Sequence, residues 1–125
     1  MESLSPNIFV NDIAKTISFY ETLGFKTTMT VPEQTPYVWV MMSAGTVTMM
    51  FQTFESLGTD LPEISHKADS GPMLFYINLK DIRTFFESIK NKVTVLKGLE
   101  KTFYGATEFT IKDCNGLVLT FAEHE

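Results

Sequence analysis

Residues 8–25 read IFVNDIAKTISFYETLGF and hold a strand, a helix start, an amphipathic helix and a helix end in one segment. The short β-prone run 7–10 comes first. Asn11 and Asp12 follow it, and either side-chain oxygen suits a helix N-cap. Apolar side chains then recur at helical spacing, at Ile13, Ile17, Phe19, Tyr20 and Leu23. Gly24 stands where a left-handed residue ends a helix, so the segment predicts a strand, a helix and a sharp exit.

The same order of patterns returns in the second half of the chain. A strand is expected over residues 73–79, and a second helix is expected to start at Asp81. The apolar face of that helix consists of Ile82, Phe85, Phe86 and Ile89. Asn115-Gly116 predicts a hairpin turn near the end of the chain. Further strands are predicted at 25–31, 37–42 and 46–53 in the first half, and at 93–96, 108–112 and 117–122 in the second.

This duplication predicts an α+β fold built from two tandem βαβββ modules. We expect one domain over 1–125, with modules 1–55 and 72–125 joined by a polar linker, 56–71. Each module buries its helix against its own sheet. We therefore expect a curved mixed sheet around a cleft, with the helices on the outside.

Composition narrows the classes of function. The net charge is −5, with 15 acidic and 10 basic residues, which argues against a nucleic-acid partner. No apolar run approaches the roughly 20 residues needed to cross a membrane, and the start of the chain lacks the pattern of a secretory signal. Cys114 is the single cysteine, so no disulfide forms within the chain. Together these features predict a cytoplasmic protein.

Two motifs carry a resemblance to a known family. Phe19, Tyr20, Leu23, Gly24 and Phe25 resemble the end of the first helix in the vicinal-oxygen-chelate superfamily, also known as the glyoxalase/bleomycin-resistance/extradiol-dioxygenase fold. The stretch 104–116 is similar to that family's closing hairpin, with a Glu-Phe pair followed by Asp-Cys-Asn-Gly where the family usually has Asp-Pro-x-Gly. The resemblance covers nearly the whole chain and implies the same fold as the duplication.

The resemblance also implies where a divalent metal would be held in the enzymes of the family. The corresponding positions here are Ser5, Met50, Leu74 and Thr120. Hydroxyl, thioether and alkyl groups are poor ligands for divalent ions, so we expect neither a metal nor another cofactor. A remaining alternative brings His66 and His124 to one cavity with a carboxylate such as Glu55 or Glu108.

Strand alternation names the side chains that would line the cleft. The expected ligand-binding residues are Asn7, Phe9, Trp39, Met50, Gln52, Tyr76, Asn78, Tyr104, Glu108 and Thr120. Three assignments remain open. Trp39 either fills the core or stacks on a ligand, and Tyr104 lies either at the cleft rim or in a plain loop. Glu108 is a buried base, a partner for a cation, or the ion-pair partner of a lysine such as Lys101.

The absent metal ligands and the resemblance to the bleomycin-resistance branch favour a metal-independent protein that binds a small molecule, a drug or a metabolite. A cationic or aromatic ligand is expected, and the family resemblance implies a homodimer. One alternative is a lyase, isomerase or dioxygenase of the same superfamily, using Glu108 with Tyr76 or Tyr104 as an acid/base pair. Another is a scaffold that uses the fold only as a platform for dimerisation.

Overall fold

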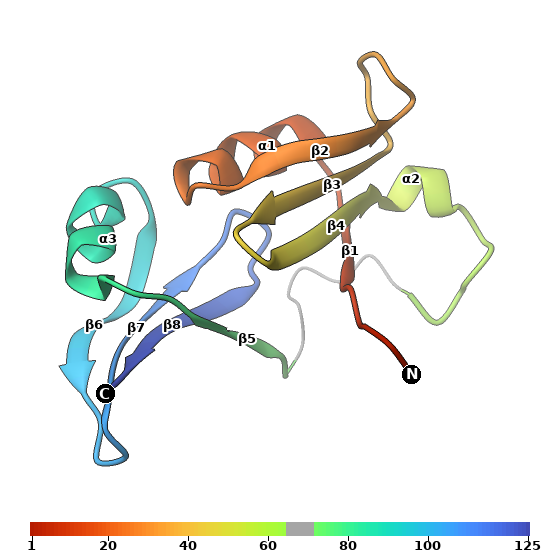
Figure 1. Ribbon diagram of the computed structural model, residues 1–125. Helices are drawn as coiled ribbons and strands as arrows, with labels where there is room; N and C mark the ends of the chain where they lie inside the picture. Colours follow the sequence, from red (N-terminus) through yellow and green to blue (C-terminus); the bar gives the residue numbers. More distant parts are fainter. Residues whose placement is uncertain (65–71) are drawn as a thin grey trace. The chain divides into compact units, whose positions relative to one another are not determined.

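The computed structural model describes residues 1–64 and 72–125, and the chain forms two compact units, Met1–His66 and Lys67–Glu125. Each unit is a module with its own four-stranded sheet (Figure 1). His66, one of the two histidines considered above, lies outside the described residues. No helix among the described residues is long and apolar enough to span a membrane.

The first module has the predicted order of strand, helix and three strands. Its sheet runs β1-β4-β3-β2, with β1 parallel to β4 and the other pairs antiparallel. A short helix follows β4 at the point where a linker was expected to begin. The elements are β1 (Asn7–Val10), α1 (Ile13–Thr22), β2 (Lys26–Val31), β3 (Trp39–Ala44), β4 (Val47–Thr53) and α2 (Phe54–Leu57).

The second module repeats this plan. Its sheet runs β5-β8-β7-β6, again with the first strand parallel to the last. The predicted α+β fold of two βαβββ modules is therefore confirmed, and its described strands are divided between two sheets. The elements are β5 (Leu74–Asn78), α3 (Ile82–Ile89), β6 (Thr94–Lys101), β7 (Ala106–Lys112) and β8 (Val118–His124).

The predicted signals at both ends of α1 are present. The Asp12 side chain accepts a hydrogen bond of 3.0 Å from the backbone N–H three residues on, as an N-cap does. At the other end Gly24 has φ +97°, and the backbone N–H of Phe25 donates to the Tyr20 carbonyl at 3.0 Å. The Tyr20 and Phe25 rings meet edge to face at 5.4 Å. This is a Schellman ending with its apolar contact.

The second helix, α3, starts at Asp81 as predicted, but this residue does not cap it. Asp81 makes no side-chain cap and has φ 58°, in the left-handed region. The cap comes instead from Glu123 of β8, whose two carboxylate oxygens accept hydrogen bonds of 3.1 Å from the backbone N–H groups of Asp81 and Ile82. A carboxylate far along the chain thus supplies the cap that the side chain of Asp81 does not provide.

In both modules the helix packs on one face of its own sheet. Tyr20 of α1 lies against Phe51 of β4 with ring centroids 4.7 Å apart, and both side chains are fully buried. In the second module Phe85 of α3 meets Phe121 of β8 at 5.0 Å, and Phe121 stacks on Phe109 at 5.2 Å. These rings form the cores. The face opposite α1 or α3 is called the helix-free face below; among the described residues only the short α2 touches it, where Phe54 lies 6.0 Å from Phe9 and Gln52 donates to Ser56 at 3.2 Å.

The closing hairpin lies where Asn115-Gly116 predicted it. Asp113 and Leu117 close it, because the Asp113 N–H donates to the Leu117 carbonyl at 2.8 Å. The buried Asp113 carboxylate also accepts hydrogen bonds of 2.8 Å from the backbone N–H groups of Asn115 and Leu117. Gly116 takes φ +88°, which disfavours a side chain. These hydrogen bonds of Asp113 hold the turn, with Cys114 at the position where the resemblance implies a proline.

Candidate functional site

The helix-free face of the first module is mainly apolar. Val40 and Phe51 point toward α1 and are fully buried, so their strand neighbours point the other way. Trp39 pairs across the sheet with Gln52 and with Val31, which places all three on the helix-free face. Trp39 is half-buried there and does not pack in the core beneath α1, whereas its role as a stacking surface for a ligand stays a prediction.

A row of methionines crosses the same face. Met29, Met41 and Met50 are register partners on β2, β3 and β4. Met29 is 56% exposed, whereas Met41 and Met50 are half-buried. Asn7 lies opposite Met50, and its amide donates to the Gln52 side chain at 3.0 Å. The face thus combines adaptable thioethers and one indole with an amide pair.

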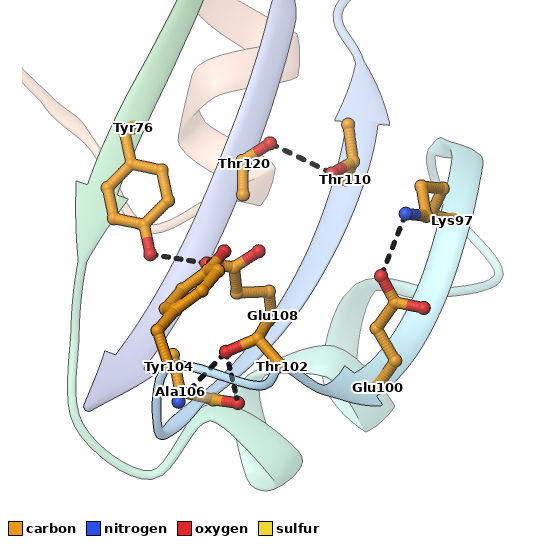
Figure 2. A network of polar contacts seen from close by, with 9 residues as sticks. All are labelled: Tyr76, Lys97, Glu100, Thr102, Tyr104, Ala106, Glu108, Thr110 and Thr120. Atoms are coloured by element: carbon orange, nitrogen blue, oxygen red, sulfur yellow. Dashed lines mark hydrogen bonds and ion pairs between the residues drawn. The ribbon is translucent and has the colours of Figure 1, made fainter. Parts of the chain in front are cut away.

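The helix-free face of the second module is polar. Tyr76 and Thr110 both lie opposite Thr120, and the two threonine hydroxyls are joined by a hydrogen bond of 2.8 Å (Figure 2). Asn78 and Glu108 lie on either side of Ala122. Thr120 and Ala122 are buried under their larger neighbours, so the exposed chemistry of this face comes from the residues around them.

Glu108 is the centre of a hydrogen-bonded cluster on this face. Its Oε2 accepts hydrogen bonds from the hydroxyls of Tyr76 and of Tyr104, the latter at 2.6 Å. Figure 2 shows the Tyr76 hydroxyl pointing toward the carboxylate. His124 Nε2 lies 3.2 Å from the Tyr76 oxygen. Because Tyr76 gives its only proton to Glu108, Nε2 must carry a hydrogen and donate to Tyr76.

The electrostatics of the cluster favour a permanent carboxylate. Partial desolvation raises the pKa of Glu108, but the hydrogen bonds from Tyr104 and Tyr76 and the charges of His124 and Lys97 outweigh it and lower the pKa overall. The same hydrogen bonds to Glu108 raise the pKa of both tyrosines. Each group is thereby stabilised in the state it holds at neutral pH.

The lysine on this face is Lys97. Its ammonium forms an ion pair of 2.8 Å with Glu100, three residues along β6. Lys101 pairs in register with Thr107, on the other face of the sheet, and the proposed ion pair between Lys101 and Glu108 is therefore wrong. Both partners of the Lys97–Glu100 pair are largely exposed, so this contact contributes little to stability.

The sequence model of the Glyoxalase/Bleomycin resistance protein/Dioxygenase superfamily matches residues 4–121. The chain belongs to this superfamily. A search of curated proteins found no match.

Solved structures share the superfamily fold over the full length of the chain. A protein of unknown function from Agrobacterium tumefaciens str. C58 is 24% identical, with a TM-score of 0.81, and the match covers 100% of this chain and 95% of that one. A bleomycin-binding protein complexed with bleomycin is 20% identical, with a TM-score of 0.69 and full coverage of both chains. The bleomycin resistance determinant encoded on the transposon Tn5 is 21% identical, with a TM-score of 0.69, and the match covers 100% of this chain and 99% of that one.

Similarity to the enzymes of the superfamily implies a site for a divalent metal. The four residues at the positions of its ligands do not fit such an ion. The Leu74 side chain has no atom that can coordinate a metal, and the Thr120 hydroxyl forms a hydrogen bond with Thr110. Ser5 precedes β1, and Met50 belongs to the methionine row. Within residues 1–64 and 72–125 no group of three or more His, Cys, Asp or Glu side chains is placed to hold a metal ion.

Most of the residues predicted for the site lie on the two helix-free faces. On the first module they are Asn7, Phe9, Trp39, Met50 and Gln52, and on the second they are Tyr76, Asn78, Glu108 and Thr120. Tyr104 follows β6 in the turn before β7 and reaches Glu108. Sequence reasoning missed Met29, Val31, Met41 and Lys97 as members of these faces. His124 was considered only as a possible metal ligand.

Proposed function

We propose that this protein binds a small organic molecule, a drug or a metabolite, without a metal ion. The observation that carries the proposal is the helix-free face of the first module, where Trp39 lies among exposed and half-buried methionines. Single exposed apolar side chains are ordinary, whereas a contiguous set suggests a contact surface. A superfamily member that holds bleomycin adds support for a ligand of this size and character.

The side chains of this face suit a planar, apolar ligand. An indole presents a large rigid surface for stacking. Methionine thioethers are polarizable and flexible, so they follow the outline of ligands that differ in shape. The Asn7–Gln52 amide pair adds donors and acceptors within the same face. We therefore assign the aromatic or apolar part of the ligand to Trp39, Met41 and Met50.

Trp39 makes the proposal directly testable, because it is the only tryptophan in the chain. Bleomycin and a panel of small aromatic compounds are titrated while tryptophan fluorescence and thermal unfolding are recorded. A ligand at a hundred times its Kd adds about 2.7 kcal/mol to the stability. Trp39→Leu should abolish the stabilisation, while Phe19→Leu, at a half-buried aromatic of α1 on the other side of the same sheet, should preserve it. Absence of any thermal or fluorescence response across the panel would refute the proposal.

The alternative is a superfamily enzyme that uses Glu108 as an acid or base. The expected partners Tyr76 and Tyr104 do contact this carboxylate. However, a general base is more effective when its pKa is raised toward neutrality, and a general acid when its pKa is lowered. In this cluster the pKa of Glu108 is lowered and the pKa values of Tyr76 and Tyr104 are raised, which is the opposite of what acid/base catalysis needs. These shifts favour binding over proton transfer.

We also propose that the protein works as a homodimer in the cytoplasm. The dimer is expected from the family resemblance and from the general frequency of two-fold homo-oligomers. The cytoplasmic location is supported by the use of a single cysteine. Light scattering during size-exclusion chromatography should give twice the chain mass of 14.2 kDa. A peak at the chain mass itself would contradict the dimer.

A further inference from the structure

The two oxygens of the Glu108 carboxylate accept different numbers of hydrogen bonds. Both tyrosine hydroxyls donate to Oε2. Among the residues that the structure describes, none donates a hydrogen bond to Oε1. An ionised carboxylate oxygen has lone pairs for further donors, so Oε1 can accept from a bound molecule. Tyr76 and Tyr104 are 43% and 52% exposed, which leaves ring surface open beside this oxygen.

The cations near this oxygen are engaged elsewhere. Lys97 forms its ion pair with Glu100, which is the register partner of Glu108 on the neighbouring strand. His124 donates to Tyr76 rather than to Glu108. The cluster therefore keeps a carboxylate whose charge is only partly balanced by its neighbours. Two tyrosine rings are tied to that carboxylate through their hydroxyls and so are held close to it.

We propose that Glu108, Tyr76 and Tyr104 bind a protonated amino group of the ligand. The ammonium N–H donates to Glu108 Oε1, and the tyrosine rings offer their electron-rich faces to the same cation. This inference rests on the proposed function and deepens it, because it names the charged group that the ligand carries. An organic ammonium fits better than a Ca²⁺ ion, since Ca²⁺ takes six to eight oxygen ligands and this cluster provides one carboxylate and two phenol hydroxyls.

Two probe molecules of similar shape, one charged and one neutral, separate the contribution of the ammonium charge to binding from that of the apolar part. Phenethylammonium and 2-phenylethanol share the phenyl ring and the ethyl chain and differ in the amino or hydroxyl group. Binding is followed by NMR through the backbone amides of β7 and β8. We expect the wild-type protein to bind the ammonium about tenfold more tightly than the alcohol, as the sum of an exposed ion pair and a cation–π contact. Glu108→Gln should reduce the two affinities to within twofold of one another.

Three further variants serve as controls. Glu87→Gln changes the net charge by the same amount, but it lies on α3 in an exposed pair with Lys90, so the tenfold preference should persist. Tyr104→Phe keeps the ring and should retain most of the preference, whereas Tyr104→Leu should lower it several-fold. An amide spectrum of each variant establishes that the fold is intact. Because Tyr104 is an exposed turn residue, its variants test the inference even where Glu108→Gln unfolds the module.

The outcomes distinguish this inference from the proposed function. Equal affinity for both probes in the wild-type protein would overturn the ammonium site, while small-molecule binding would stand. A preference that survives in Glu108→Gln would likewise overturn it. If neither probe shifts any amide of β7 or β8 up to its solubility limit, the ammonium site is refuted. The proposed function is then judged separately by the fluorescence of Trp39.

Discussion

Removing the carboxylate of Glu123 should destabilise the second module by weakening the start of α3. The side chain is half-buried and satisfies two backbone N–H groups, each at 3.1 Å. Loss of a helix cap typically costs about 1 kcal/mol, and loss of the negative charge at a helix N-terminus costs about 0.3–1 kcal/mol more. We therefore expect Glu123→Ala to lower the free energy of unfolding by about 2 kcal/mol. Glu123→Gln, which keeps an acceptor, should cost about half as much.

Differential scanning calorimetry measures the predicted loss of stability through the change in Tm. For a chain of 125 residues, 1 kcal/mol corresponds to a shift in Tm of about 4 °C, so Glu123→Ala should lower Tm by about 8 °C. Asp81→Gly is the matched comparison, because it removes the carboxylate and glycine adopts the left-handed φ of 58° at this position without strain. That variant should change the stability by less than about 0.5 kcal/mol. If Asp81→Gly costs as much as Glu123→Ala, the assignment of the cap to β8 is wrong.

Two further predictions concern the polar cluster and the metal. Because the pKa of Glu108 is lowered below 4.5 in the folded protein, its contribution to stability is complete above the unfolded value and disappears as the pH falls through the folded one. The difference in stability between the wild type and Glu108→Gln should therefore be constant above pH 4.5 and shrink as the pH falls below it, and a difference that does not change with pH in acid would contradict the lowered pKa. Dialysis against EDTA should leave Tm and ligand affinity unchanged, whereas elemental analysis that finds stoichiometric zinc, nickel, iron or manganese would contradict metal independence.

Local signals predicted much of the fold. The caps of α1 and the spacing of its apolar residues are encoded within one continuous segment, and these elements form as expected. The later part of β6 was missed, because Gly98 and the charges around it interrupt the strand pattern. The register of β6 against β7 shifts twice along its length, which is why Lys97 rather than Lys101 shares a face with Glu108.

Other features depend on contacts that no local pattern encodes. A register irregularity between Thr27 and Met29 reverses the alternation of β2 and brings Met29 and Val31 onto the face of Trp39. The facing of Trp39 itself is decided by the burial of Val40 against α1. Likewise, Glu123 caps α3 only because β8 places its carboxylate at the start of that helix. Each of these features follows from the strand register, which is set only once the sheet has assembled.

The two modules share a plan but carry different chemistry on their helix-free faces. Equivalent register pairs join the first and last strand in each module, Asn7 with Met50 in one and Tyr76 with Thr120 in the other. On the helix side, both modules keep a buried phenylalanine at the next position of the last strand, Phe51 and Phe121. Packing against a helix constrains the size and polarity of that side. Neither α1 nor α3 packs on the other side of its sheet, and it is there, on the methionine and tryptophan surface of one module and the carboxylate and tyrosine cluster of the other, that the proposed ligand contacts lie.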